Sequence, residues 1–298
     1  MPIKTVAILS PGEMGAATGK AFQQNGFDII TSLEGRSDTS RNRADAAGFR
    51  DCGTITLTLA EADIVFSILP PGEALAQAKR VGTIMKQTGH TPLYFDCNAV
   101  APETAAQIGL VIEAAGASYI DGGIVGNPPG AEVPTRFFVS GSGAQQVNIF
   151  DGKGIDIKQC GREAGKASAI KMCYAGITKG TSALHAAMLM AAEKLEIADE
   201  LHHELIYSQG AMYKRMEGLT PALPAVSDRY IGEMQEIEKT LGSVGMPTGF
   251  HSGSADLYRL MDKSPYASEI RETVDKSRTL RQTVEGCAAV IDSKDVTE

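Results

Sequence analysis

The sequence predicts an α/β protein in which a doubly wound parallel sheet is followed by an all-α C-terminal region. Short apolar runs alternate with helical segments from residue 5 to about residue 160. A glycine-containing turn follows the first of these runs directly. Beyond about residue 161 helix-forming residues dominate, and no second strand-rich region follows. We therefore expect two domains, residues 1–162 and residues 163–298.

The first element is an apolar strand over residues 5–9, which breaks into a glycine turn before an alanine-rich helix. Gly12 lets the backbone approach a pyrophosphate, and Gly15 lets the helix pack close to the strand. The N-terminal amides of that helix then face the anion. Ser10 stands at the first position of the usual G-x-G-x-x-G pattern. The turn predicts a dinucleotide site of the Rossmann type made by Ser10, Gly12, Glu13, Met14 and Gly15; the alternative is an ordinary structural turn.

The second strand, expected over residues 27–33, is followed by residues that select the cofactor. Glu34 lies nineteen residues after Gly15, a spacing that suits a bond to a ribose 2′-hydroxyl. Arg36 and Ser37 follow at once and suit a 2′-phosphate, because arginine pairs bidentately with phosphate oxygens. We therefore favour NADP, with NAD as the alternative cofactor. The other interpretation is a solvated helix face that carries Arg36, Arg41 and Arg43.

Three more strands are expected over residues 63–69, 93–96 and 118–121, each ending in a proline, polar or glycine-rich loop. The carboxyl ends of strands in an open parallel sheet form the crevice that binds ligands. We therefore assign to the cofactor site Leu69, Pro70 and Asn98, and to the substrate site Asn98, Gly122 and Gly123. Strands over residues 136–140 and 155–160 extend the sheet.

The C-terminal half reads as a set of helices. A long helix is expected between residues 165 and 194, where proline is absent and small residues recur at four-residue spacing. Further helical segments are expected over residues 198–217, 222–241, 254–261 and 268–291. The acidic tail over residues 292–298 is expected to fray. So much helical surface predicts a two-fold homodimer.

The composition predicts a cytoplasmic protein that binds a small-molecule substrate. The net charge is −8 and the pI is about 5.3, so we expect no nucleic-acid partner. The five cysteines are odd in number and include no C-x-x-C pair, which argues against a disulfide framework and against a metal site. No stretch of eighteen apolar residues occurs, so we expect no membrane segment.

Five segments in order carry a family resemblance: LSPGEMG, ADIVFSILPP, DCNAVAPET, SYIDGGIVG and GREAGKASAIKMCYAGITKG. Together they resemble the β-hydroxyacid dehydrogenase superfamily, which includes 6-phosphogluconate and 3-hydroxyisobutyrate dehydrogenases. The resemblance covers residues 1 to about 195. The remainder is similar to a less characterised branch whose C-terminal domain has no settled function. The resemblance implies a Rossmann domain, a helical domain that commonly dimerises, and oxidation of a β-hydroxy acid by NAD(P).

The resemblance also implies a catalytic lysine early in the long helix, after spaced glycines. Lys171 holds that position, after Gly161 and Gly165. A lysine there can remove a hydroxyl proton as hydride leaves the substrate, or donate a proton in the reverse direction. The alternative is a surface lysine on an amphipathic helix.

Three departures from the family pattern concern the substrate: Ala175 replaces an asparagine, Asn98 replaces a serine, and Val125 replaces another hydroxyl. Tyr174 and Thr178 lie three and seven residues after Lys171, on the same helical face. We expect Tyr174 to serve catalysis and Thr178 to bind substrate, the alternative for Tyr174 being a packing role. His251, before a predicted helix, is a further substrate-binding candidate.

The sequence therefore predicts an NADP-dependent oxidoreductase that transfers a hydride between nicotinamide and a small hydroxy acid, or a related alcohol or carbonyl compound. Lys171 is its general acid or base. Two alternatives stay open. The first is an imine reductase on the same fold, and the second is a noncatalytic NADPH-binding sensor.

Overall fold

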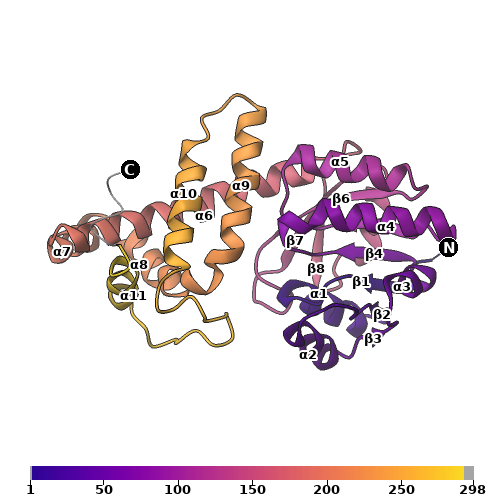
Figure 1. Cartoon of the computed structure of the whole chain (residues 1–298), viewed down its shortest axis with the longest axis horizontal. Helices are drawn as coiled ribbons and strands as arrows, with labels where there is room; N and C mark the ends of the chain where they lie inside the picture. Colours follow the sequence, from indigo (N-terminus) through magenta and orange to yellow (C-terminus); the bar gives the residue numbers. More distant parts are fainter. Residues whose placement is uncertain (1, 292–298) are drawn as a thin grey trace. The chain divides into compact units, whose positions relative to one another are not determined.

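The computed structural model describes residues 2–291 and divides into two compact units, Met1–Tyr174 and Ala175–Glu298 (Figure 1). The division falls inside the long helix α6 (Lys166–Lys194), whereas the sequence pattern changes at about residue 162. The first turn of α6 is hydrogen-bonded to Asp121 of the sheet. The acidic tail expected to fray, residues 292–298, lies outside the described residues.

Within the described residues, the first unit contains an eight-stranded sheet in the order β3-β2-β1-β4-β5-β6-β7-β8. All neighbours are parallel except β6 and β7, which are antiparallel. The strands are β1 (Thr5–Ile8), β2 (Asp28–Thr31), β3 (Arg50–Asp51), β4 (Ile64–Ser67), β5 (Leu93–Asp96), β6 (Tyr119–Val125), β7 (Thr135–Ser140) and β8 (Ile155–Gln159). This order confirms the doubly wound Rossmann arrangement.

Helices cover both faces of the sheet, and each face has its own apolar core. One core joins the sheet to α1 (Glu13–Gln24), α2 (Asp38–Ala47) and the 3₁₀ segment η2 (Ala144–Phe150). The other joins it to α3 (Ile55–Glu61), to α4 (Ala74–Thr88), which follows the 3₁₀ turn η1 (Pro71–Glu73), and to α5 (Pro102–Glu113). Helices α4 and α5 lie side by side (Figure 1). The central strands β1, β4, β5 and β6 are therefore buried on both faces, as their apolar runs predict.

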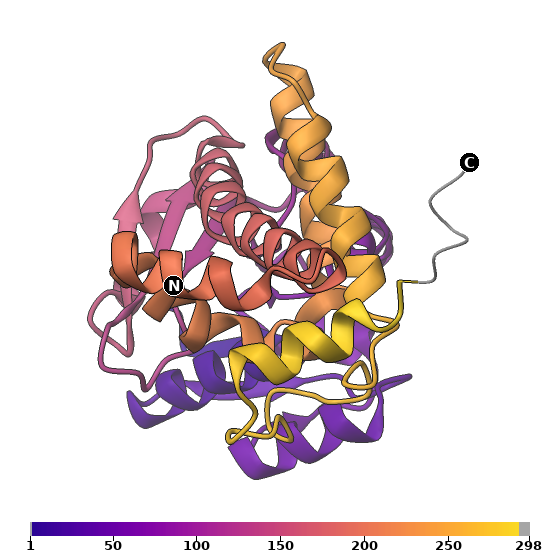
Figure 2. The same ribbon diagram turned by 90° about the vertical axis from the view of Figure 1, so that its left-hand side faces the viewer.

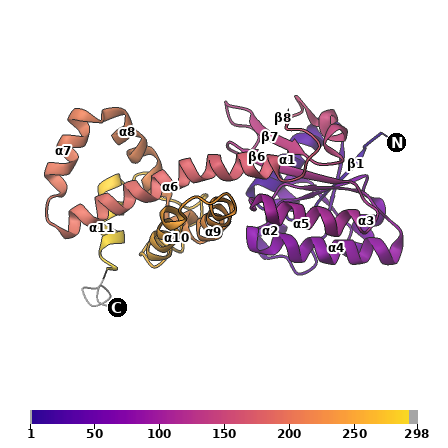
Figure 3. The ribbon, with the colours of Figure 1, turned by 90° about the horizontal axis from the view of Figure 1, so that it is seen from above.

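The second unit contains the rest of α6 and the remaining helices. These are α7 (Ala198–Ser208), α8 (Gly210–Leu219), α9 (Ser227–Ser243), α10 (Gly249–Met261) and α11 (Leu280–Ala288), with 3₁₀ turns η3 (Thr220–Ala222) and η4 (Pro224–Val226). Helices α9 and α10 form an antiparallel hairpin, drawn in orange in Figure 2. Beyond α6 the chain turns back through α7 and α8 (Figure 3). The all-α character of this region is confirmed.

Some expected helix limits in this unit are wrong. The segment over residues 198–217 is two helices, because Gln209 leaves the helical conformation at φ −134° and ψ 38°. The segment over residues 222–241 starts late, because two proline-containing 3₁₀ turns precede α9. The segment over residues 268–291 is an α-helix only in α11, and the chain before it forms a loop.

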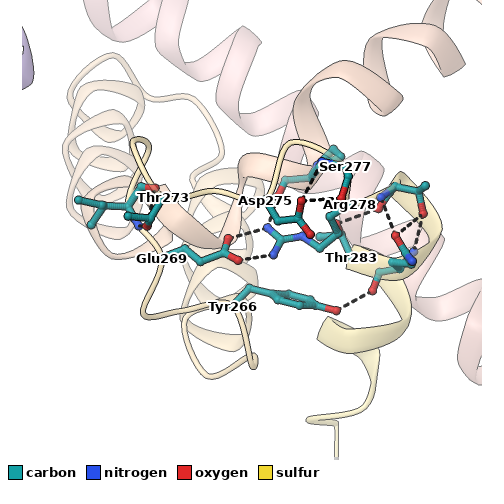
Figure 4. Close-up of polar contacts among 11 residues, drawn as sticks. Tyr266, Glu269, Thr273, Asp275, Ser277, Arg278 and Thr283 are labelled. Atoms are coloured by element: carbon teal, nitrogen blue, oxygen red, sulfur yellow. Dashed lines mark hydrogen bonds and ion pairs between the residues drawn. The ribbon is translucent and has the colours of Figure 1, made fainter.

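Arg278 holds this loop, as Figure 4 shows. Its side chain is 8% exposed, and its Nη1 and Nη2 atoms donate to the two carboxylate oxygens of Glu269 at 2.6 and 2.7 Å. Nη2 also donates to the carbonyl of Pro221 at 2.7 Å. The guanidinium lies 4.0 Å from the centre of the Tyr266 ring. Arg278 thus joins the loop to Glu269, Pro221 and Tyr266 through a buried, bidentate ion pair, a hydrogen bond and ring stacking.

Within residues 2–291, no helix combines the length and apolarity needed to cross a membrane.

Candidate cofactor and catalytic site

The predicted glycine turn follows β1, the strand that lies between β2 and β4 and at which the strand order of the sheet reverses. Gly12 is the N-cap of α1 and supplies no side-chain cap, and a β-carbon built on it would meet nothing within 4 Å. A β-carbon on Gly15 would collide with the carbonyl oxygen of Ser10. The turn is therefore open to a ligand at Gly12 and tightly packed at Gly15, which fits a pyrophosphate at the start of α1.

The loop after β2 contains the residues predicted to select the cofactor. Arg36 is half-buried, and its burial lowers its pKa from the ordinary value. Ser37 is the N-cap of α2 and accepts a bond from the amide of Ser40 at 3.3 Å. Glu34 forms an exposed ion pair with Arg80 of α4 at 3.1 Å. Arg80 lies more than forty positions from this loop, so no local sequence signal could have identified it.

Arg41 has a different role from the solvated helix face considered above. Its Nη2 atom donates to the carbonyl of Leu33 at 2.6 Å, and its Nε atom donates to the carbonyl of Arg36 at 3.2 Å. These bonds tie the loop to the end of β2. Arg41 therefore fixes the backbone that carries Arg36.

Asn98 follows β5 and joins the ends of two strands. Its side chain is 2% exposed, its Oδ1 atom accepts from the amide of Leu69 at 2.5 Å, and its Nδ2 atom donates to Ser67 Oγ at 3.1 Å. Asn98 therefore fixes the loop that contains Leu69 and Pro70. Direct contact of Asn98 with cofactor or substrate stays a prediction.

Asp96, which the sequence interpretation missed, lies behind Asn98. The amide and the side-chain nitrogen of Asn98 donate to its Oδ1 at 3.1 and 2.5 Å, and the hydroxyl of Tyr119 donates to its Oδ2 at 3.2 Å. Burial raises the pKa of Asp96 to about 7, and the nearby charge of Asp121 adds to the rise, while these hydrogen bonds oppose it.

This raised pKa makes the stability of the fold depend on pH. The pKa of Asp96 is about 4 in the unfolded chain and about 7 in the folded protein. At a pH between these two values, the folded carboxyl keeps a proton that the unfolded chain has released. The free energy of unfolding therefore falls as the pH rises through this window. We expect Asp96→Asn to remove this contribution, at most about 1.4 kcal/mol per pH unit. Urea denaturation of both proteins across the window measures it, and identical pH dependences would contradict the assignment.

Gly122 and Gly123 were expected in a loop after a strand, and that expectation is wrong: both lie inside β6, paired with Val139 and Phe138. A β-carbon on Gly122 would lie 2.5 Å from the Phe95 ring. One on Gly123 would lie 2.5 Å from the carbonyl oxygen of Ala167 and 2.9 Å from the β-carbon of Lys171. Two adjacent glycines in a strand thus allow α6 to approach the sheet closely.

This close approach places Lys171 at the carboxyl edge of the sheet. In register, Ser67 pairs with Asp96, and Asp96, the last residue of β5, pairs with Asp121. Gly123 lies two residues farther along β6, so the helix backbone that touches it lies at the edge where β1, β4 and β5 end. Lys171 is half-buried, and Tyr174 is 45% exposed. The first unit therefore brings Lys171 to the edge that carries the glycine turn, while the catalytic roles stay predictions.

Thr178 and His251 belong to the helical unit. The Thr178 hydroxyl donates to the carbonyl of Ala175 at 3.4 Å, and His251 Nε2 lies 3.2 Å from the carbonyl oxygen of Gly176. Both contacts are internal to that unit. Their role in binding substrate stays a prediction.

Two family models match the chain. Residues 5–149 match the NAD-binding domain of 6-phosphogluconate dehydrogenase, and residues 192–261 match a domain of unknown function. An uncharacterised 28.5 kDa protein of Methanothermus fervidus is 26% identical over 208 residues, covering 70% of this chain and 78% of the relative. A probable 3-hydroxyisobutyrate dehydrogenase of Mycobacterium tuberculosis is 24% identical over 211 residues, covering 68% of each chain.

Solved structures share the fold. A conserved protein of unknown function, described as structurally similar to 3-hydroxyacid dehydrogenases, is 28% identical with a TM-score of 0.64 and covers 87% of this chain and 96% of its own. The 3-hydroxyisobutyrate dehydrogenase of M. tuberculosis with L-serine is 19% identical with a TM-score of 0.65, and the match covers 96% of this chain and 99% of that structure's chain. An imine reductase of Myxococcus stipitatus with NAD⁺ is 18% identical with a TM-score of 0.52, and the match covers 88% of this chain and 93% of that structure's chain.

Proposed function

We propose that the chain is an NADP-dependent oxidoreductase, because residues 5–149 match the NAD-binding domain of 6-phosphogluconate dehydrogenase. Its substrate is a small hydroxy acid, or a related alcohol or carbonyl compound. The observation that carries this proposal is the close approach of α6 to Gly123, because Lys171 then lies at the carboxyl edge of the sheet, where open parallel sheets bind ligands. The probable dehydrogenase among the relatives supports the same class of substrate.

The cofactor is held by the glycine turn and by the loop after β2. The amides at the start of α1 receive the pyrophosphate, and Gly12 leaves space for it. Arg36 pairs with the 2′-phosphate, and Ser37 adds a hydroxyl beside it. The bound nicotinamide supplies or accepts the hydride.

Replacing Arg36 tests the choice of NADP. We expect Arg36→Ala to weaken NADPH binding by about 1.5 to 3 kcal/mol, the range of a charge-assisted hydrogen bond, and to leave NADH binding nearly unchanged. Titration of cofactor fluorescence measures both constants. Arg43→Ala is the control, because Arg43, which is half-buried, lies within the next helix, α2, and outside the loop after β2. Equal losses for NADPH and NADH would show that Arg36 does not read the 2′-phosphate.

Lys171 handles the proton at the reacting oxygen. In the oxidative direction its Nζ atom takes the proton of the substrate hydroxyl, while the carbon that bears this hydroxyl loses the hydride that the nicotinamide would accept. In the reductive direction Nζ returns the proton to the oxygen. Tyr174, one helical turn later, assists in the place of the asparagine that Ala175 replaces. Binding of substrate by Thr178 and His251 stays a prediction.

A substrate panel followed by cofactor absorbance separates this function from its alternatives. Oxidation of 3-hydroxy acids or reduction of the matching aldehydes supports the proposal. Reduction of a cyclic imine alone favours the imine reductase. Tight NADPH binding without turnover of any compound favours the noncatalytic sensor.

We also propose that the protein is a cytoplasmic homodimer. All five cysteines, which lie within the described residues, are free thiols, as in a reducing compartment. In the helical unit α6 and α10 form an apolar groove of about 340 Å³. Leu184 and Phe250 line it and are 59% and 79% exposed. Such a surface is typical of an interface between copies.

Light scattering tests this assembly. We expect a two-fold dimer at micromolar concentration and a shift toward monomer in Phe250→Glu, because a buried unpaired carboxylate opposes association. Tyr207→Glu, at an 89% exposed position of α7 outside the groove, is the matched control. A monomeric wild-type protein at this concentration would contradict the prediction.

A further inference from the structure

A buried carboxylate in the sheet accepts hydrogen bonds from the backbone amides of the first turn of α6. Asp121, in β6, is 1% exposed. Its Oδ2 atom accepts from the amides of Gly165, Ala167 and Ser168 at 2.8, 3.1 and 3.2 Å. Its Oδ1 atom accepts from the hydroxyl of Ser168 at 2.5 Å. A helix normally receives these bonds from a residue of its own N-terminus, whereas α6 receives them from a strand more than forty residues earlier.

The neighbouring strand β7 contributes a second contact to the same point. Ser140 pairs in register with Asp121, and its hydroxyl donates to Asp121 Oδ2 at 2.7 Å. The same hydroxyl accepts from the amide of Ala167 at 3.1 Å. Two strands of the sheet therefore hold one helical turn. The negative charge also lies at the positive end of the dipole of α6, which strengthens the attachment.

This attachment is next to Lys171 in the structure. Gly123 lies two residues after Asp121 on β6 and touches the helix at Ala167 and Lys171. Ser168, which is bonded to Asp121 through both backbone and hydroxyl, precedes Lys171 by one helical turn. The strand therefore fixes α6 at two adjacent points, one polar and one by close backbone approach. A shift of the first turn would carry the lysine with it.

We propose that Asp121 is a positioning residue that anchors the first turn of α6 and thereby sets the location of Lys171 at the carboxyl edge of the sheet. The role rests on the proposed function, because it concerns the geometry of that lysine. A cap that only stabilises the fold would change the amount of folded protein. A positioning residue changes the turnover of the folded protein, because a displacement of about 1 Å can cost about 100-fold in rate.

The test compares Asp121→Asn with Asp63→Asn. Asp63 is the matched control, because its Oδ2 atom also accepts two backbone amides, those of Lys4 and Thr5, at the other edge of the sheet. For Asp121→Asn we expect kcat to fall about 10- to 100-fold, with KM and the Kd of NADPH within about twofold of wild type. We expect faster hydrogen exchange confined to the first turn of α6. Asp63→Asn should keep the wild-type kcat.

Ser168→Ala keeps the proposal testable if Asp121→Asn does not fold, since it removes one donor and leaves the carboxylate in place. We expect it to lower kcat about 3- to 10-fold with the same unchanged KM. Faster exchange at the first turn with a wild-type kcat would overturn the positioning role. Full activity of Lys171→Met would instead refute the proposed function, so the two failures are distinguishable.

Discussion

Replacing Lys171 with methionine is expected to lower kcat by about two to four orders of magnitude, the usual contribution of a positioned proton-transfer group. Methionine keeps the length and apolar stem of the side chain but neither holds nor releases a proton at neutral pH. The Kd of NADPH should stay within about twofold, because the predicted cofactor contacts do not include Lys171. Steady-state kinetics on the substrate identified by the panel, with fluorescence titration of NADPH, measures both quantities.

Three further variants test whether the loss of activity comes from the missing proton-transfer group. Lys171→Arg should restore little activity, because arginine does not release its proton at working pH. Lys166→Met is the matched control, since Lys166 begins the same helix, is exposed and pairs with Glu163 at 3.0 Å. Tyr174→Phe separates catalysis from packing: a large loss assigns the hydroxyl a role, and an unchanged rate leaves the ring as a surface contact. Near-normal turnover of Lys171→Met would favour the imine reductase instead.

Replacing Arg278 with methionine is expected to lower the free energy of unfolding by about 3 kcal/mol or more. The change leaves the carboxylate of Glu269, whose side chain is 20% exposed, without its bidentate partner. It also releases the carbonyl of Pro221 and the stacking on Tyr266. Urea denaturation followed by circular dichroism measures the loss, and proteolysis should become faster in the loop before α11.

Arg281→Met is the control for this prediction. Arg281 has two carboxylate partners, Asp199 at 2.6 Å and Glu285 at 2.9 Å, but its side chain is 52% exposed. Ion pairs at the surface contribute little, so its loss should be small. The double variant with Glu269→Met should recover part of the stability lost in Arg278→Met, because no unpaired charge then remains. Equal losses at Arg278 and Arg281 would contradict a structural role for the buried pair.

The N-terminal fold follows closely from local sequence. The central strands were predictable because both faces of the sheet are covered there, so each of them reads as an apolar run bounded by a turn. The two-residue edge strand β3, which is polar and exposed, was not predicted. The glycine turn was predictable because its steric demands act within six residues, and Gly12 and Gly15 meet the environments that the pattern implies. The long helix was predictable from the absence of proline over residues 165–194.

The helical unit was less predictable. The loop before α11 was expected as helix, since its sequence carries no strong helix-breaking signal near Arg278. The irregular backbone is stabilised there by Glu269, Pro221 and Tyr266, contacts that span up to 57 positions. Local propensity is a weak guide where long-range contacts of this kind are available.

The sequence by itself determined the doubly wound sheet and the glycine turn after its first strand, because each depends on residues within one or two elements, whereas Lys171 was chosen only through the family resemblance. Only the tertiary structure decided that Gly122 and Gly123 are strand residues, and that Asp96 is bonded to Tyr119 and Asp121 to Ser140 and the first turn of α6. The physical reason is that these residues act across strands and across the contact with α6. Burial and hydrogen bonding between distant segments leave no periodic pattern in a single sequence, so they become visible only when the chain has folded.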